Sequence, residues 1–131
     1  MRFLSILFCV AVAALPLNAE AQGRRDGAHV KFEQTECDFG EVSRKGSNQL
    51  CVFNFVNNGT EPLVVLSVTT SCSCVKPIFL RKPIAVGEKG KIELLVDVKK
   101  MDKGIFHRVV QVRSNSVGGA VILTLKGVAK D

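Results

Sequence analysis

The fold is decided by one stretch, Gln49-Leu50-Cys51-Val52-Phe53-Asn54-Phe55-Val56-Asn57-Asn58-Gly59. Cys51, Phe53 and Phe55 lie two residues apart, so in an extended strand their side chains point to the same face. Asn57-Asn58-Gly59 follows, and residues of these types form turns. The stretch therefore predicts a strand over residues 49–57 that has one apolar face and ends in a turn.

Similar short runs of strand-forming residues occupy the chain from His29 onward. Turn residues separate them, and no stretch after residue 21 has sustained helical periodicity. Many short strands at close spacing predict a β-sandwich or barrel. The least regular stretch, residues 71–89, contains Pro77 and Pro83 and is expected to form an edge or a loop. The expected strands lie near residues 30–32, 37–40, 49–57, 62–69, 91–98, 105–113 and 121–128.

The N-terminus has the pattern of a secretory signal peptide. Met1-Arg2 precedes an uncharged apolar run, and small residues follow at Ala19 and Ala21. We predict a signal peptide over residues 1–21, a flexible lead over 22–28 and one domain over 29–131. The apolar run is too short for a membrane span, so the mature chain is expected in the periplasm or at the cell surface. Cys9 is interpreted as an ordinary apolar signal residue.

The net charge of +6 constrains the partners. Basic residues favour acidic partners, but here they are scattered, and the chain has no Trp or Tyr on which bases could stack. We therefore expect no nucleic-acid partner and interpret the charge as a solvated surface. Binding to an anionic glycan or lipid stays open as a third hypothesis.

A series of short motifs is more specific than composition. The motifs are Asp38-Phe39-Gly40-Glu41-Val42, Phe53-x-Phe55-x-Asn57-x-Gly59-x-x-Pro62-Leu63, Ser71-Cys72-Ser73-Cys74, Pro83-Ile84-x-x-Gly87-Glu88, Gly104-x-Phe106, Ser114-Asn115 and Leu125-x-Gly127. In this order and spacing the chain resembles a family of exported bacterial domains of unknown function, which is similar to the Hydin-type and major-sperm-protein-like immunoglobulin folds. The resemblance covers about residues 30–128 and implies an all-β, immunoglobulin-like β-sandwich of about seven strands, with no enzymatic activity.

The chain departs from that family at two places. The family usually has Ser-Cys-Gly-Cys followed by Thr, whereas Ser73 and Val75 stand here, and the Pro of its Pro-Gly-Glu is replaced by Val86. A function of the Cys-x-Cys segment that needs the glycine is therefore not implied for this chain.

Several of these residues have scaffold roles that physics alone predicts. Phe53 and Phe55 should be buried between two sheets, with Leu63 and Val65 facing them. Asn57 can bond the turn backbone through its side chain. We expect Gly59 to supply a positive φ in the turn, and Gly40 to allow a break or bulge in its strand.

The sequence predicts no catalytic residue and no cofactor. Its two histidines, His29 and His107, are far apart and have no recognisable nucleophile beside them. Cys72 and Cys74 are candidates for a soft metal ion or a redox pair, since residues two apart on a strand share a face. A closed zinc site needs about four ligands, so small, half-buried structural cysteines are the favoured interpretation.

Four cysteines remain after residue 21, and an oxidising compartment permits disulfides. Cys37 has the strand parity of Phe39, and the turn near residues 44–47 is expected to place its strand beside that of Cys51. We predict that any native disulfide is Cys37–Cys51, with two reduced core cysteines as the alternative. Cys72 and Cys74 are expected to stay unbridged, because residues two apart on a strand are separated by about 6.4–6.8 Å, near the limit for a disulfide.

These observations support two main hypotheses for function. The first is a non-catalytic exported module that binds, or gives structure to, an unidentified envelope protein or glycan. The second is a thiol or metal-handling protein that uses Cys72 and Cys74.

Overall fold

The computed structural model describes residues 26–131, and nearly all regular structure in them is β-strand. A short 3-10 helix, η1 (Val98–Lys100), follows β6. The strands are β1 (Val30–Phe32), β2 (Glu36–Ser43), β3 (Gln49–Asn57), β4 (Val65–Thr70), β5 (Val75–Ile78), β6 (Lys89–Val96), β7 (Gly104–Ser114) and β8 (Val121–Lys130).

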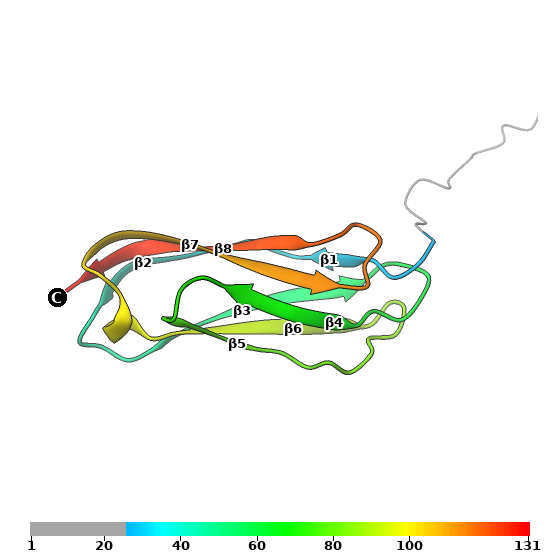
Figure 1. Cartoon of the computed structure of the whole chain (residues 1–131), viewed down its shortest axis with the longest axis horizontal. Helices are drawn as coiled ribbons and strands as arrows, with labels where there is room; N and C mark the ends of the chain where they lie inside the picture. The colour runs from blue at the N-terminus through cyan, green and yellow to red at the C-terminus, as the bar shows by residue number, and fades with distance from the viewer. Residues whose placement is uncertain (1–25) are drawn as a thin grey trace, which may run out of the picture.

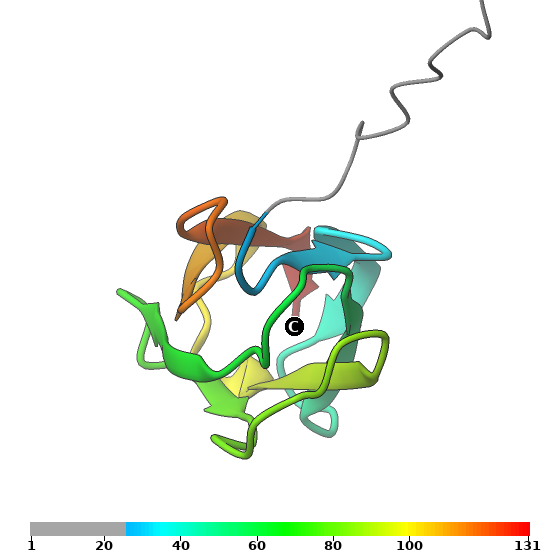
Figure 2. The same ribbon diagram turned by 90° about the vertical axis from the view of Figure 1, so that its right-hand side faces the viewer.

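The strands form two four-stranded sheets that pack against each other (Figures 1 and 2). Sheet A has the order β1-β3-β6-β5, and sheet B has the order β2-β8-β7-β4. The first five strands alternate between the sheets, and β2 and β8 are the one parallel pair among these strands. The fold is therefore an all-β, immunoglobulin-like β-sandwich, as the sequence predicted.

The core between the sheets is built from strand residues of alternating parity. Phe53 and Phe55 of β3 are 1% and 2% exposed, and the ring of Phe55 packs against that of Phe32 with centroids 5.4 Å apart. Leu63 and Val65, which the sequence placed in the same core, are 0% and 2% exposed. The predicted burial of all four side chains is confirmed.

Asn57, at the end of β3, is a buried polar residue that joins three segments of the chain. Its side chain is 0% exposed. Its Nδ2 donates to the carbonyl oxygens of Glu61 at 2.8 Å and Ile84 at 2.9 Å, and its Oδ1 accepts from the N–H of Gly59 at 3.0 Å and of His29 at 3.4 Å. The expected bond to the turn backbone is present, together with long-range bonds that no local pattern could reveal.

Two glycines of the motif series have different reasons for being glycine. Gly40 has φ = 63°, and the register of β2 on β8 shifts between Asp38 and Glu41, so the predicted bulge is present. The positive φ predicted for Gly59 is wrong, because its φ is not in that region. A Cβ at Gly59 would instead collide with the backbone of Gly27 and His29. Its small size permits a close approach of two chain segments.

β5 was not among the strands expected from the sequence, but residues 71–89 were expected to form an edge or a loop, and β5 lies at the edge of sheet A. The N–H of Asp97 donates to the carbonyl of Cys74 at 2.7 Å. By the alternation of an antiparallel ladder, the backbone nitrogens of Val75 and Pro77 face the open edge. Pro77 has no N–H, and that of Val75 donates to the carbonyl of Cys72 at 3.3 Å. This edge therefore offers few donors to an added strand.

The ordered domain begins within residues 22–28, which were predicted to be a flexible lead. Ala28 is 2% exposed, and the backbone of Gly27 exchanges hydrogen bonds with Thr60. The predicted signal peptide, residues 1–21, lies outside the described residues. Within residues 26–131, no helix is long and apolar enough to cross a membrane.

Candidate functional site

Cys37 of β2 and Cys51 of β3 are joined by a disulfide, with their Cα atoms 6.7 Å apart. The sequence argument placed their strands side by side in one sheet, and that placement is wrong. β2 lies in sheet B and β3 in sheet A, because the turn after β2 carries the chain across the sandwich. The bridge therefore links the two sheets through the core.

Cys72 and Cys74 also form a disulfide, which contradicts the prediction that this pair stays unbridged. The prediction assumed an extended strand. Instead, the segment turns before β5 begins, and the N–H of Val75 donates to the carbonyl of Cys72. The turn brings the two Cα atoms to 5.2 Å, well inside the range of roughly 4.4–6.8 Å that a disulfide accepts.

The two disulfides differ in how much they constrain the unfolded chain. Cys37–Cys51 closes a loop with a sequence separation of 14, whereas the separation for Cys72–Cys74 is 2. On the chain-entropy model the first contributes about 3 kcal/mol and the second about 1.6 kcal/mol. The larger contribution comes from Cys37–Cys51, and the small ring of Cys72–Cys74 adds less to stability.

The Cys72–Cys74 pair is exposed on one side only. Cys74 is 2% exposed and belongs to the core, while Cys72 is half-buried and lies between the exposed Ser71 and Ser73. The N–H of Cys74 donates to Sγ of Cys72 at 3.3 Å, and Oγ1 of Thr70 accepts from the N–H of Cys72 at 3.3 Å. Both of these hydrogen bonds therefore involve Cys72.

Residues 26–131 contain no group of three or more His, Cys, Asp or Glu side chains that could hold a metal ion. In the disulfide form, the sulfurs of Cys72 and Cys74 are bonded to each other rather than present as thiolates. Thiolate is the form of cysteine that binds metal. The geometry therefore offers no support for the metal-binding interpretation of this pair.

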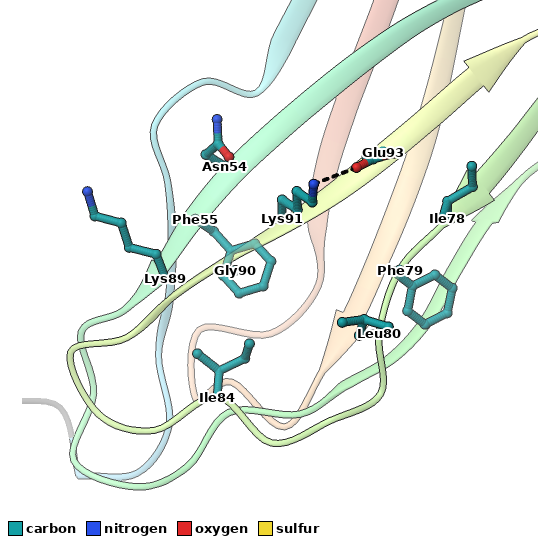
Figure 3. A pocket seen from close by; sticks show the side chains of 10 residues that line it. All are labelled: Asn54, Phe55, Ile78, Phe79, Leu80, Ile84, Lys89, Gly90, Lys91 and Glu93. Atoms are coloured by element: carbon teal, nitrogen blue, oxygen red, sulfur yellow. Dashed lines mark ion pairs between the residues drawn. The ribbon is translucent and has the colours of Figure 1, made fainter.

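A groove of about 560 Å³ lies on sheet A, between the strands β3 and β6 and the segment that follows β5 (Figure 3). Its apolar lining comes from Phe55, Ile78, Phe79, Leu80 and Ile84. Leu80 is 76% exposed and Ile78 is 44% exposed. The groove thus presents apolar side chains to solvent.

Gly90 of β6 helps to form the groove. It pairs in register with Phe55, and a Cβ at this position would lie 2.5 Å from the Phe55 ring and 2.9 Å from Cδ1 of Ile84. Because Gly90 has no side chain, both apolar groups reach the floor of the groove. The groove was not predicted from the sequence, because it depends on how residues 78–84 lie against β3 and β6.

Two basic residues, Lys89 and Lys91, line the groove. Nζ of Lys91 pairs with Oε1 of Glu93 at 2.8 Å (Figure 3), and the guanidinium of Arg81 lies 5.8 Å from the centroid of the Phe79 ring. None of Arg81, Lys82 and Lys89 makes an ion pair with a carboxylate of the described residues. Lys89 in the lining and Arg81 beside it therefore give the groove unpaired positive charge.

The histidines do not form an acid–base site. His107 is exposed on β7 in sheet B, opposite Lys126 in the register. Lys126 bonds to Glu36, and that hydrogen bond and the Glu36 charge raise the pKa of Lys126, as expected for a surface ion pair. His29 contacts Asn58 in the turn region. No described nucleophile is hydrogen-bonded to either ring, so these groups are not arranged for catalysis.

The fold and the residues described above define an immunoglobulin-like sandwich domain with one inter-sheet disulfide, one disulfide in a turn and one apolar groove. Residues 30–129 match a family model described as a protein of unknown function, DUF1573, and the chain belongs to that family. No protein with curated information matches the chain in sequence.

Solved structures share the fold. A protein of unknown function from Porphyromonas gingivalis W83 has a TM-score of 0.70 and 19% identity, over 85% of this chain and 51% of that one. The ASH / PapD-like domain 7 of human CEP192 has a TM-score of 0.63 and 9% identity, over 78% and 85%. The YadV chaperone has a TM-score of 0.57 and 10% identity, over 78% of this chain and 52% of that one. The chain thus spans about half of the Porphyromonas protein, and identities this low show a common fold alone.

Proposed function

We propose that this chain is an exported, non-catalytic module that binds a segment of another envelope protein in the groove beside β5. The observation that carries the proposal is the groove itself, in which Leu80 and Ile78 are held open to solvent next to the buried ring of Phe55. Exposed apolar side chains in a concave site are typical of a binding surface.

The charges around the groove indicate the chemistry of the partner segment. Lys89 lines the groove and Arg81 lies over the ring of Phe79 in its lining, and neither has a carboxylate partner among the described residues. A segment with apolar residues next to Asp or Glu would fill the groove and pair with these cations. The occupant is therefore an apolar protein segment flanked by acidic residues.

The segment is expected to bind through its side chains. Strand addition at a sheet edge requires unpaired backbone donors and acceptors on that edge. Pro77 removes one donor of β5, and the N–H of Val75 is already bonded. The groove beyond Ile78 is the part of this edge that remains suited to binding.

The comparisons support a binding role. YadV, which shares the fold, is named a chaperone, and its name indicates interaction with other proteins. Sandwiches of this class present loops and grooves to partners while the scaffold stays unchanged. A partner protein in the envelope fits the predicted export of the chain.

A selection of random short peptides on the purified chain tests the proposal. We expect the enriched peptides to combine Leu, Ile or Phe with Asp or Glu, and Leu80→Asp to weaken their binding at least about tenfold. The control is Ile105→Asp, because Ile105 is 88% exposed on β7 in the other sheet. Peptides that bind Leu80→Asp as tightly as the unchanged chain would overturn the proposal, and so would the lack of any enrichment.

A further inference from the structure

The turn before β5 contains a second feature that does not depend on the groove. The Cys72–Cys74 disulfide joins Cys72, a half-buried residue that packs against the core, to Cys74, which is buried in it. An attacking thiolate approaches a disulfide at one sulfur and expels the other. Cys72 is the more exposed of the two residues, so attack is expected at its sulfur, with Cys74 as the leaving sulfur.

A backbone donor is already directed at the sulfur of Cys72. The N–H of Cys74 lies 3.3 Å from that Sγ, measured from nitrogen to sulfur. When the disulfide opens, the same N–H can stabilise a thiolate on Cys72, since a hydrogen bond to the charged form favours it. Cys74, buried among apolar side chains, has the opposite tendency, because burial disfavours a thiolate.

The turn is also held by hydrogen bonds, which do not depend on the disulfide. The N–H of Cys72 donates to Oγ1 of Thr70, the carbonyl of Cys72 accepts from Val75, and the carbonyl of Cys74 accepts from Asp97. The two sheets are separately joined by Cys37–Cys51. Opening the Cys72–Cys74 bond is therefore expected to leave the domain and the turn in place.

We propose that Cys72 and Cys74 form a thiol–disulfide exchange site that accepts two electrons from a dithiol. The substrate's first thiolate attacks Sγ of Cys72, which forms a mixed disulfide and releases Cys74 as a thiolate that takes up a proton. The substrate's second thiolate then attacks the substrate sulfur of the mixed disulfide and releases Cys72. The substrate becomes a disulfide, and the cysteine pair becomes a dithiol.

The exposed serines beside Cys72 indicate the class of substrate. Ser71 and Ser73 are exposed on either side of it, so the attacked sulfur is approached from a surface and not through a closed pocket. A half-buried cysteine between exposed neighbours is suited to a flexible dithiol segment of a protein. The reverse reaction, with the pair reduced, follows the same steps in the opposite order.

Equilibration of the full chain in glutathione buffers, followed by alkylation and peptide mapping, tests the proposal. We expect Cys72–Cys74 to open at a ratio of reduced to oxidised glutathione that leaves Cys37–Cys51 closed, with the near-UV circular dichroism of the folded domain retained. Opening of both bridges at the same ratio, together with unfolding, would overturn the proposal.

Single variants test the assigned roles of the two sulfurs. In Cys74→Ser, the remaining Cys72 should form a mixed disulfide with glutathione at least about tenfold faster than Cys74 does in Cys72→Ser. Equal rates, or a faster reaction at Cys74, would contradict the assignment. If either variant unfolds, the sulfur that carries glutathione can be mapped in the unchanged chain at partial reduction, and an adduct on Cys74 would have the same meaning.

Discussion

A single residue at the end of β3, Asn57, connects segments that are distant in the sequence. Asn57 is a polar residue in the middle of the core, and its amide satisfies backbone groups on both sides of the turn and in the segment before β6. A buried amide with four partners holds a defined arrangement, since each partner left alone would cost free energy. The turn residues are therefore as much a part of the scaffold as the apolar ones.

Asn57→Ala should lower the free energy of unfolding by about 3 kcal/mol, because several buried backbone groups lose their partner at once. Denaturation in urea measures the change. The control is Asn54→Ala on the same strand, whose exposed side chain points to the outer face, and a change within about 0.5 kcal/mol is expected there. Equal losses for the two variants would show that the Asn57 network does not stabilise the fold.

Local sequence rules predicted some of these residues and failed at others. The bulge at Gly40 and the turn bond of Asn57 depend on neighbours in sequence, and both were predicted. The reason for Gly59 lies in the approach of Gly27 and His29, which are about thirty positions away. The bridge between Cys72 and Cys74 required knowing that the segment turns before β5, and a turn of two cysteines and two serines has no pattern that distinguishes it from a strand end.

The alternation of apolar and polar residues predicts some strands of this fold and not others. β3 was predicted with its observed bounds, because its apolar residues alternate over its full length. β5 was expected only as an edge or a loop, because it has four residues and includes Pro77, and a proline argues against a strand except at an edge. The groove was missed, since its wall is the segment that follows β5 and its floor comes from β3 and β6.

The two faces of β3 give a direct test of the core. Phe53→Ala should cost about 3–5 kcal/mol, the range for removing a core Phe, because its side chain is 1% exposed. Val52→Ala is the matched control, since the neighbouring side chain is 43% exposed and points outward. Chemical denaturation should separate the two variants, and a loss under about 1 kcal/mol for Phe53→Ala would contradict the assignment of the inner face.

Pro77 should act as a barrier to pairing between copies of the chain. Pro77→Val restores a backbone N–H on the open edge of β5, and such an edge is a template for another strand. We expect self-association that rises with concentration, measured by light scattering after size-exclusion chromatography. Pro83→Val makes the same chemical change beyond the strand and should stay at the mass of the unchanged chain. Identical behaviour of both variants would remove this role from Pro77.

At the scale of the whole molecule, the two ends of the described chain lie at opposite ends of the sandwich (Figure 1). A disulfide between the sheets requires an oxidising compartment, and export would supply one. The two expectations, export and oxidised cysteines, support each other.

Exported chain is expected to begin at Gln22, because Ala19 and Ala21 suit cleavage after residue 21. N-terminal sequencing of the exported fraction from a bacterial host checks this. Leu7→Arg places a charge in the apolar run and should retain the chain in the cytoplasm, whereas Cys9→Ser should leave export unchanged. Exported material that starts at Met1 would contradict the prediction, and a lipid on Cys9 would make the chain a membrane-anchored one.

The two disulfides allow a comparison in which the side chains are matched. Each pair has one buried and one half-buried cysteine: Cys51 and Cys74 are 8% and 2% exposed, and Cys37 and Cys72 are packed against the core. Replacing either pair with alanine therefore removes similar side-chain contacts, and the difference between the double variants reports the cross-link. Because the loop closed by Cys37–Cys51 is the longer one, removal of that disulfide should lower the free energy of unfolding by about 3 kcal/mol, against about 1.6 kcal/mol for the other pair.

Urea denaturation under oxidising conditions measures the free energy of unfolding of both double variants. A larger loss from the Cys72→Ala/Cys74→Ala variant would show that the small ring, and not the bridge between the sheets, is the main covalent support of the fold.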